Sequence, residues 1–101
     1  MNSLTRKLLT IVTESALERV LSDDLERLGA RGFTITEARG KGSRGMRSGS
    51  WDKNSNIRIE ILCDTTTAEA ITVHLQKHYY EDYAMVLFMS DVTVLRPKKF
   101  G

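Results

Sequence analysis

The sequence has few of the features that mark the more specialised classes of protein. Of its 101 residues, one is cysteine, one is proline and one is tryptophan. A single cysteine, Cys63, excludes an internal disulfide, and we expect a reducing, cytoplasmic environment. Apolar runs stay short of the roughly 18 residues that a membrane helix needs. Leu8–Val12 is also too short for the apolar region of a secretory signal peptide, so we expect no membrane insertion.

Acidic residues are scarce in one part of the chain. The stretch 40–58 contains a single acid, Asp52, against five cations: Lys41, Arg44, Arg47, Lys53 and Arg58. Because the whole chain carries only +2, its basic character is confined to this stretch. Proteins that bind nucleic acid usually present a broad basic stripe instead. We therefore expect a local anion site and no nucleic-acid partner.

Apolar residues make up 41% of the chain, enough for the core of one small domain. Their spacing predicts strands at Lys7–Thr13, Phe33–Arg39, Ile57–Cys63 and Tyr83–Met89, with a short final strand at Val92–Leu95. A helix is expected within each half, so the order is βαβ–loop–βαβ. This order favours an α+β, ferredoxin-like sandwich, a four-stranded antiparallel sheet with two helices on one face. The fourth strand is apolar on both faces, which predicts burial by another subunit.

Two capping boxes place the starts of the helices, Ser15 with Glu18 and Thr66 with Glu69. Each helix then carries an apolar stripe at helical spacing. The residues of the two stripes are Leu17, Val20, Leu21, Leu25 and Leu28, and Ala68, Ile71, Leu75 and either His78 or Tyr79.

The glycine-rich stretch GKGSRGMRSGS, residues 40–50, is the most informative segment. Glycine lets backbone N–H groups approach a ligand closely, and successive N–H groups can enclose an anion. Arginine matches the oxygens of phosphate or carboxylate with two parallel hydrogen bonds. A solvated hairpin without function is the alternative. The loop's length of about 16 residues favours function, since loops this long are uncommon in small domains.

At this loop the sequence resembles the PII signalling proteins. The resemblance rests on TxTExxGxG at 34–42, GKGSRGMRSGS, SNIRIEIL, the pair Asp82-Tyr83 and VLRxxKF at 94–100, and it runs from about Lys7 to Phe100. The strings are most similar to the PII-like branch tied to inorganic carbon, the SbtB and carboxysome-associated types.

The resemblance implies one domain over residues 1–101 that forms a homotrimer and binds adenine nucleotides in the clefts between subunits. The T-loop, about residues 40–56, would change conformation with the bound nucleotide. The implied role is signal transduction that controls bicarbonate uptake or fixation. The implied partner is a bicarbonate transporter or a carboxysome protein.

The resemblance also implies particular site residues. The nucleotide would be bound by Thr34, Gly40, Lys41, Gly42, Ser43, Arg44, Arg47, Leu62, Tyr83, Ala84, Met85, Val86, Arg96 and Lys98. Thr34 and Leu62 would line the adenine pocket, while Arg96 and Lys98 would reach the phosphates from a neighbouring subunit. Bicarbonate, a small planar anion, would bind at Lys41, Arg44 and Arg47.

One segment departs from the family pattern. Typical PII proteins grip the β- and γ-phosphates with a loop that contains glycine and lysine, and here the stretch 80–85 reads YEDYAM. Glu81 and Asp82 would repel a polyphosphate. We therefore expect AMP, ADP or cyclic AMP as the effector, with no obligatory cofactor.

Proteins with this order of strands and helices have other functions as well. An RNA-recognition module stacks bases on aromatic residues of its central strands, whereas Ile57–Cys63 has none. An acylphosphatase-like hydrolase needs an arginine in the phosphate cradle after the first strand, and residues 12–15 read VTES. A protein-docking module without nucleotide sensing remains the alternative.

Residues that suggest chemistry have simpler interpretations. His74 and His78 have the spacing of metal ligands on one helix face, but no third ligand has matching spacing. Cys63 has no neighbouring base in the sequence and is interpreted as a core thiol. Glu14 is assigned to the dipole of the helix that follows it. We expect no catalytic site and no metal site.

Overall fold

The computed structural model describes residues 4–40 and 56–95, and it has the predicted order of strands and helices. Its elements are β1 (Leu4–Glu14), the 3-10 helix η1 (Ser15–Leu17), α1 (Glu18–Arg27), β2 (Thr34–Ala38), β3 (Asn56–Cys63), α2 (Thr65–His78) and β4 (Met85–Val94). Within the described ranges, neither α-helix is long and apolar enough to cross a membrane.

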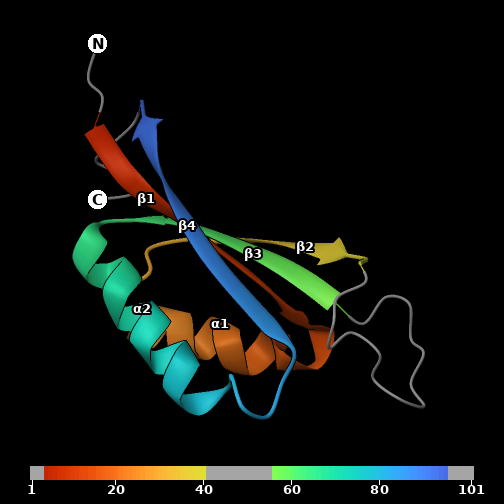
Figure 1. The fold of residues 1–101 in the computed structure, drawn as a ribbon. Helices are drawn as coiled ribbons and strands as arrows, with labels where there is room; N and C mark the ends of the chain where they lie inside the picture. The colour runs from red at the N-terminus through yellow and green to blue at the C-terminus, as the bar shows by residue number, and fades with distance from the viewer. Residues whose placement is uncertain (1–3, 41–55, 96–101) are drawn as a thin grey trace.

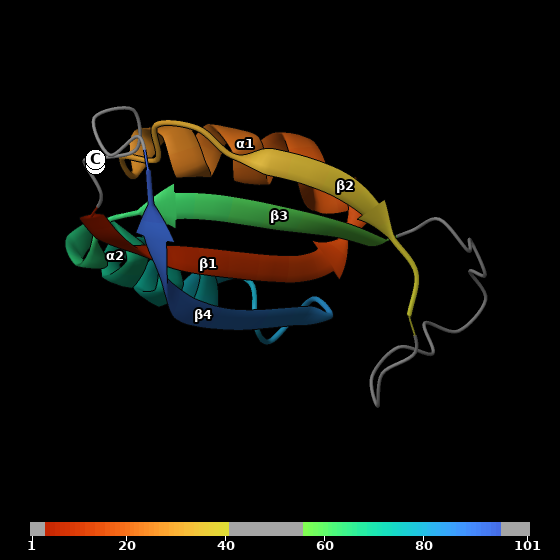
Figure 2. The ribbon, with the colours of Figure 1, turned by 90° about the horizontal axis from the view of Figure 1, so that it is seen from above.

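The four strands form one antiparallel sheet in the order β2-β3-β1-β4. Both helices pack on the same face of this sheet, and no helix or strand of the described residues covers the opposite face, called the open face below, as Figures 1 and 2 show. The predicted ferredoxin-like sandwich is thus confirmed.

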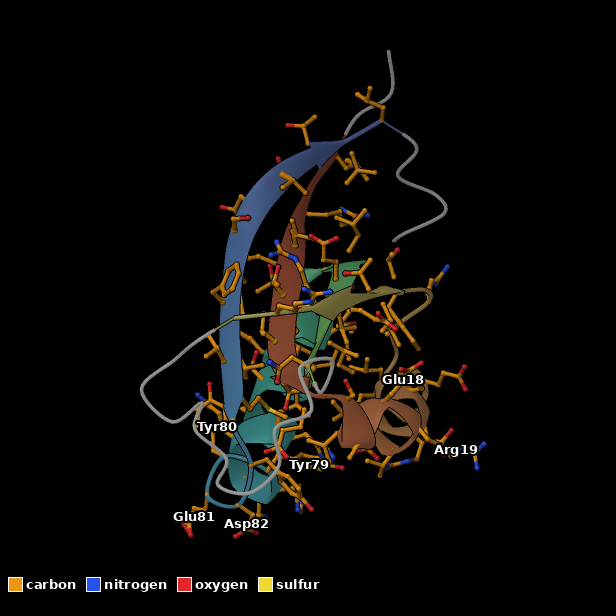
Figure 3. The ribbon with its side chains drawn as sticks, turned by 90° about the vertical axis from the view of Figure 1, so that its right-hand side faces the viewer. Glu18, Arg19, Tyr79, Tyr80, Glu81 and Asp82 are labelled. Atoms are coloured by element: carbon orange, nitrogen blue, oxygen red, sulfur yellow. The ribbon has the colours of Figure 1, made fainter. Side chains whose placement is uncertain are left out.

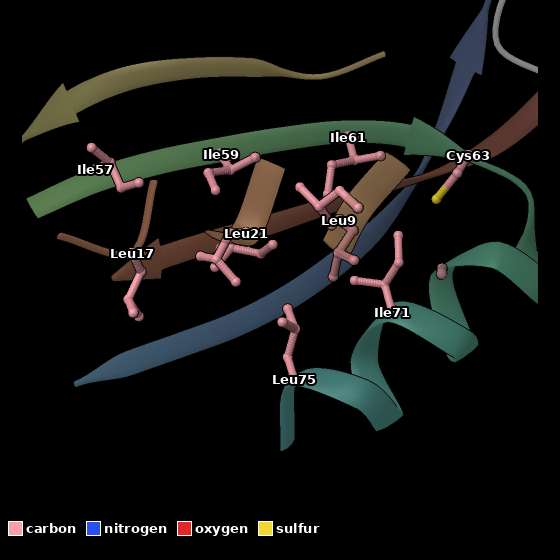
Figure 4. Close-up of a cluster of buried hydrophobic side chains, with 12 residues drawn as sticks. Leu9, Leu17, Leu21, Ile57, Ile59, Ile61, Cys63, Ile71 and Leu75 are labelled. Atoms are coloured by element: carbon pink, nitrogen blue, oxygen red, sulfur yellow. The ribbon is translucent and has the colours of Figure 1, made fainter. Parts of the chain in front are cut away.

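The core lies between the sheet and the helices (Figure 4). Alternate residues of the central strands point into it, because side chains along a strand alternate between the two faces. The sheet contributes Leu9, Ile11, Ile57, Ile59 and Ile61, and the helices contribute Leu17, Leu21, Leu25, Ala68, Ile71 and Leu75. Burial of each large aliphatic side chain stabilises the fold by roughly 1.5–3 kcal/mol.

The predicted stripe on α1 is wrong at one position. Val20 is 42% exposed, whereas Asp24, which was not predicted, is only 6% exposed. On α2 the stripe is correct and ends at Tyr79, which packs against the core, while His78 is exposed.

Both predicted capping boxes are wrong. The chain enters α1 through η1, so Glu14 is the N-cap of the first turn and Ser15 is already inside it. On α2 the cap is Asp64, whose carboxylate accepts a 2.8 Å hydrogen bond from the N–H of Thr67.

Gly29 ends α1 in a left-handed conformation, with φ of 106°. Its N–H donates to the carbonyl of Glu26, and the N–H of Ala30 donates to the carbonyl of Leu25. These two bonds form a Schellman motif, which needs the positive φ that glycine adopts without strain. The helix therefore stops here and the chain turns back toward β2.

The last strand differs from the prediction in its bounds. It begins at Met85 rather than Tyr83 and continues through Ser90 and Asp91 without a break. Asp91 stays in the ladder opposite Lys7, and the two form an ion pair of 2.7 Å. The predicted second piece, Val92–Leu95, is therefore the end of β4 and not a separate strand.

Candidate functional site

A groove of about 650 Å³ lies on the open face of the sheet. Its lining includes Thr34 from β2, Glu60 and Leu62 from β3, Leu8 from β1 and Val92 from β4. Thr34 pairs with Glu60, and Leu62 lies two residues further along β3, so all three point to the same face. The structure therefore brings together the two residues assigned to the adenine pocket, Thr34 and Leu62. Aliphatic walls with a few polar groups suit a planar ring.

A second set of predicted residues lies near the other end of the sheet. Met85 pairs with Thr13, whereas Leu62 pairs with Leu8, five residues back along β1. At about 3.3 Å per residue, roughly 17 Å of β1 separates the position opposite Leu62 from the position opposite Met85. Gly40 follows β2 at the end where Ala38 pairs with Asn56, so it lies at the same end as the stretch 83–86.

One copy of the chain does not bring the two described sets together. The groove with Thr34 and Leu62 and the end with Gly40 and residues 83–86 are two separate regions of the described chain. The other predicted residues lie outside the described part of the chain: Lys41, Gly42, Ser43, Arg44, Arg47, Arg96 and Lys98.

The loop between α2 and β4, residues 79–84, is fixed to the end of β1. The hydroxyl of Thr13 donates a 2.7 Å hydrogen bond to the carbonyl of Ala84. The N–H of Ala84 donates a 2.8 Å hydrogen bond to Oε2 of Glu14. Glu14, which the sequence analysis assigned to the helix dipole, anchors this loop in the structure. The sequence shows no sign of the contact because the two residues are 70 positions apart.

Within the same loop, the N–H groups of Asp82 and Tyr83 both donate to the carbonyl of Tyr79, at 3.2 and 3.0 Å. The rings of Tyr79 and Tyr83 also pack together, with centroids 5.9 Å apart. Figure 3 shows Tyr79, Tyr80, Glu81 and Asp82 gathered at this end of the molecule. Glu81 and Asp82 are exposed and carry negative charge.

A buried polar cluster behind this loop was missed by the sequence analysis. The carboxylate of Asp24 accepts hydrogen bonds from the Tyr79 hydroxyl (2.7 Å) and from Arg27, and lies 3.0 Å from Nε2 of His74. Burial alone would raise the pKa of Asp24, but the hydrogen bonds from Tyr79, His74 and Arg27 outweigh it and lower that pKa. Burial and the neighbouring Asp24 carboxylate raise the pKa of Tyr79 to about 12. The one sign of this cluster in the sequence is an acidic residue, Asp24, at helical spacing among the leucines of α1.

The structure accounts for the other candidate residues. Cys63 is 4% exposed, and burial, with a smaller contribution from Asp64, raises its pKa to about 11. A thiol that is buried and protonated is a core residue and a poor nucleophile. The ring of His74 packs on His78 with centroids 4.5 Å apart, but its Nε2 faces Asp24. Residues 4–40 and 56–95 contain no group of three side chains placed to hold a metal ion.

Comparison with known proteins assigns the chain to a family. The family model for nitrogen regulatory protein P-II matches residues 6–99. A structure from Thermus thermophilus, described as a PII-like signalling protein, is 44% identical over 100% of both chains, with a TM-score of 0.85.

Structures of CPII from Thiomonas intermedia are also similar. CPII bound to ADP and bicarbonate is 31% identical, covering 99% of this chain and 98% of that one, with a TM-score of 0.85. CPII bound to ADP, AMP and acetate is 27% identical over 99% and 98% of the two chains, with a TM-score of 0.84. The fold, the match along almost the whole chain and these similarities agree: the chain belongs to the PII family of signalling proteins.

Proposed function

We propose that the protein senses AMP or ADP in clefts between the subunits of a homotrimer, and that it passes this signal to a protein partner. The observation that carries the proposal is the division of the predicted site. The groove around Thr34 and Leu62 and the end with Gly40 and residues 83–86 are separate in one chain. Half-sites at two ends of one sheet can form a single cleft when neighbouring copies meet, each contributing one half.

In this cleft the adenine ring lies in the groove, between Leu62 and the aliphatic residues of β4. The Thr34 hydroxyl and the Glu60 carboxylate supply polar groups for the edge of the base. The neighbouring copy brings Gly40 and the stretch 83–86 toward the ribose and phosphates. Lys41, Gly42, Ser43, Arg44 and Arg47 from the T-loop, with Arg96 and Lys98, complete the phosphate site as the family resemblance implies.

The signal is a change in the T-loop, about residues 40–56. A phosphate that neutralises Arg44 and Arg47 favours the conformation in which these side chains meet it, an order–disorder switch of the kind common in signalling proteins. The switch requires that the nucleotide bind one conformation more tightly than the other.

Bicarbonate is the proposed second effector, at Lys41, Arg44 and Arg47. The proposal draws support from CPII, whose structure contains ADP and bicarbonate. A carbonate-like anion suits the planar donors of arginine. Control of inorganic-carbon uptake or fixation, through a bicarbonate transporter or a carboxysome protein, is then the proposed role, as in the branch that the loop sequence resembles.

The first experiment is calorimetric titration with AMP, cyclic AMP, ADP and ATP, each with and without bicarbonate. We expect micromolar binding of AMP or ADP, tightened by bicarbonate and lost in Arg44→Ala. If no adenine nucleotide binds, the sensor is disproved and the docking module becomes the better interpretation.

A complementation test addresses the shared cleft. Leu62→Glu places a charge in the groove, and Arg44→Ala removes a phosphate contact, so each variant alone should bind no nucleotide. In trimers co-expressed from both variants, about a quarter of the clefts by random assortment combine the two intact halves, and binding should return at that level. If the mixture stays inactive while it still forms trimers, both halves belong to one subunit.

A further inference from the structure

We propose that Glu14 determines which nucleotides this site accepts, by disfavouring those with a third phosphate. The inference rests on the proposed function, since it concerns the same cleft. It starts from the 2.8 Å hydrogen bond between the Ala84 N–H and Oε2 of Glu14. This bond places a carboxylate at the loop that leads into β4, at the end of the sheet where β2 also ends.

A backbone site for phosphate needs successive N–H groups that point outward to the anion. In this loop three successive N–H groups are already used inside the chain: those of Asp82 and Tyr83 by the carbonyl of Tyr79, and that of Ala84 by Glu14. The loop therefore offers a further phosphate none of these three donors.

The carbonyl of Ala84 accepts a hydrogen bond from the hydroxyl of Thr13, a residue that is 2% exposed. The N–H of Ala84 donates to Glu14. Both polar backbone groups of Ala84 are thus fixed by the last two residues of β1. Releasing the Ala84 N–H requires breaking a charge-assisted hydrogen bond, which is about twice as strong as a neutral one.

Glu14 is half-buried and anchored, whereas Glu81 and Asp82 are exposed. An exposed side-chain charge is mobile and screened by salt, while a fixed and partly buried one keeps more of its field. Glu14 is therefore expected to weaken polyphosphate binding more than either exposed acid does. AMP has a single phosphate next to the ribose, so Glu14 is expected to weaken its binding least.

The test compares nucleotides across matched variants. Glu14→Gln keeps a carbonyl oxygen that can accept the Ala84 N–H but removes the charge, and Glu14→Ala removes both. Glu81→Gln neutralises an exposed acid of the same loop. Glu69→Gln, an exposed position in α2 away from the loop, is the control for net charge. Dissociation constants for AMP, ADP and ATP are measured by calorimetry, and a thermal melt establishes that each variant is folded.

We expect the ratio of the ATP constant to the AMP constant to fall about 3- to 10-fold in Glu14→Gln and further in Glu14→Ala, which also frees a donor. Glu81→Gln should lower the ratio less, and Glu69→Gln should leave it unchanged. Hydrogen exchange of the Ala84 amide should stay slow in Glu14→Gln and become fast in Glu14→Ala.

Two outcomes overturn the inference. If Glu14→Gln changes the affinities for all three nucleotides by the same factor, Glu14 only holds the fold. If the ratio of the ATP constant to the AMP constant changes in Glu14→Gln no more than in Glu69→Gln, the charge of Glu14 does not reach the phosphates. A wild-type protein that binds no nucleotide is a different result, because it disproves the proposed function before any variant is compared.

Discussion

The hydroxyl of Tyr79 donates a 2.7 Å hydrogen bond to Oδ2 of Asp24, which joins the end of α2 to the inner side of α1. The ring of Tyr79 also packs on that of Tyr83, one residue before Ala84. The interior of the helix layer is therefore connected, through two aromatic rings, to the loop that Glu14 anchors. A change at Asp24 is expected to affect the stability of the fold and the position of this loop together.

Tyr79→Phe should destabilise the protein by about 1.5–3 kcal/mol, the usual contribution of a hydrogen bond to a charged group. The loss arises because Asp24, whose side chain is only 8% exposed, is left with fewer donors. Urea unfolding of the variant and the wild type measures the difference. Tyr80→Phe, the same change one residue later, is the control, and an equal loss in both variants would contradict the role of this bond.

Through Asp24 and Tyr79, the free energy of unfolding should also depend on pH in both the acidic and the alkaline range. The pKa of Asp24 is lowered in the fold, so its contribution is present above the unfolded value of about 4 and is lost as pH falls below it. The pKa of Tyr79 is raised to about 12, so its contribution is present below about pH 10 and is lost as pH rises toward 12. Ultraviolet titration should show one of the three tyrosines ionising near pH 12, and Tyr79→Phe should remove that step.

Cys63 should be almost inert in the folded protein. Its pKa of about 11 reduces the thiolate fraction at neutral pH by roughly a hundredfold relative to an ordinary thiol, and burial adds a steric barrier. Reaction with a thiol reagent should therefore be slow in buffer and fast in denaturant. Fast modification under native conditions would show that the end of β3 opens readily.

The segment 64–69 contains two candidate caps of α2. Asp64 is the cap in the structure, whereas the sequence predicted Thr66. Asp64→Ala should lower the melting temperature, because the N–H of Thr67 loses its acceptor. Asp64→Asn should retain most of the stability, since its side-chain oxygen can accept the same bond. Thr66→Ala should have the smaller effect, and a larger loss there than in Asp64→Ala would restore the capping box predicted from the sequence.

This segment also shows where sequence reasoning was limited. Asp64 and Thr66 are both good caps and lie two residues apart, so the local pattern alone does not choose between them. The four strands of the sheet and the two α-helices were predicted correctly in order and type, because alternation and helical spacing are local and repeat several times. The separate strand at Val92–Leu95 was wrong, and η1 was not predicted. The Thr34–Leu62 groove was predicted from the family motif and agrees with the strand register.

The contacts that were missed are those without a local pattern. Asp24 meets Tyr79 across 55 residues, and Glu14 meets Ala84 across 70. Each depends on how α1, α2 and the end of β1 pack, and packing is not encoded in the spacing of neighbours. These two contacts therefore became visible only in the structure.

The open face of the sheet offers the sharpest test of the proposed trimer. On β4, Val86 and Phe88 point away from the helices and are 56% and 50% exposed. Apolar side chains gathered on an open sheet are typical of an interface, and a second copy of this chain is the proposed cover. Phe88→Glu would place a charge in that interface and should dissociate the trimer to monomers, as measured by light scattering after gel filtration.

Val73→Glu is the matched control, because Val73 is 63% exposed on α2, in the helix layer on the other side of the sheet. It should leave the trimer intact. Nucleotide binding should be lost with the trimer in Phe88→Glu and retained in Val73→Glu, since a cleft made of two half-sites needs two subunits. A Phe88→Glu monomer that still bound AMP or ADP with wild-type affinity would instead place the whole site within one chain.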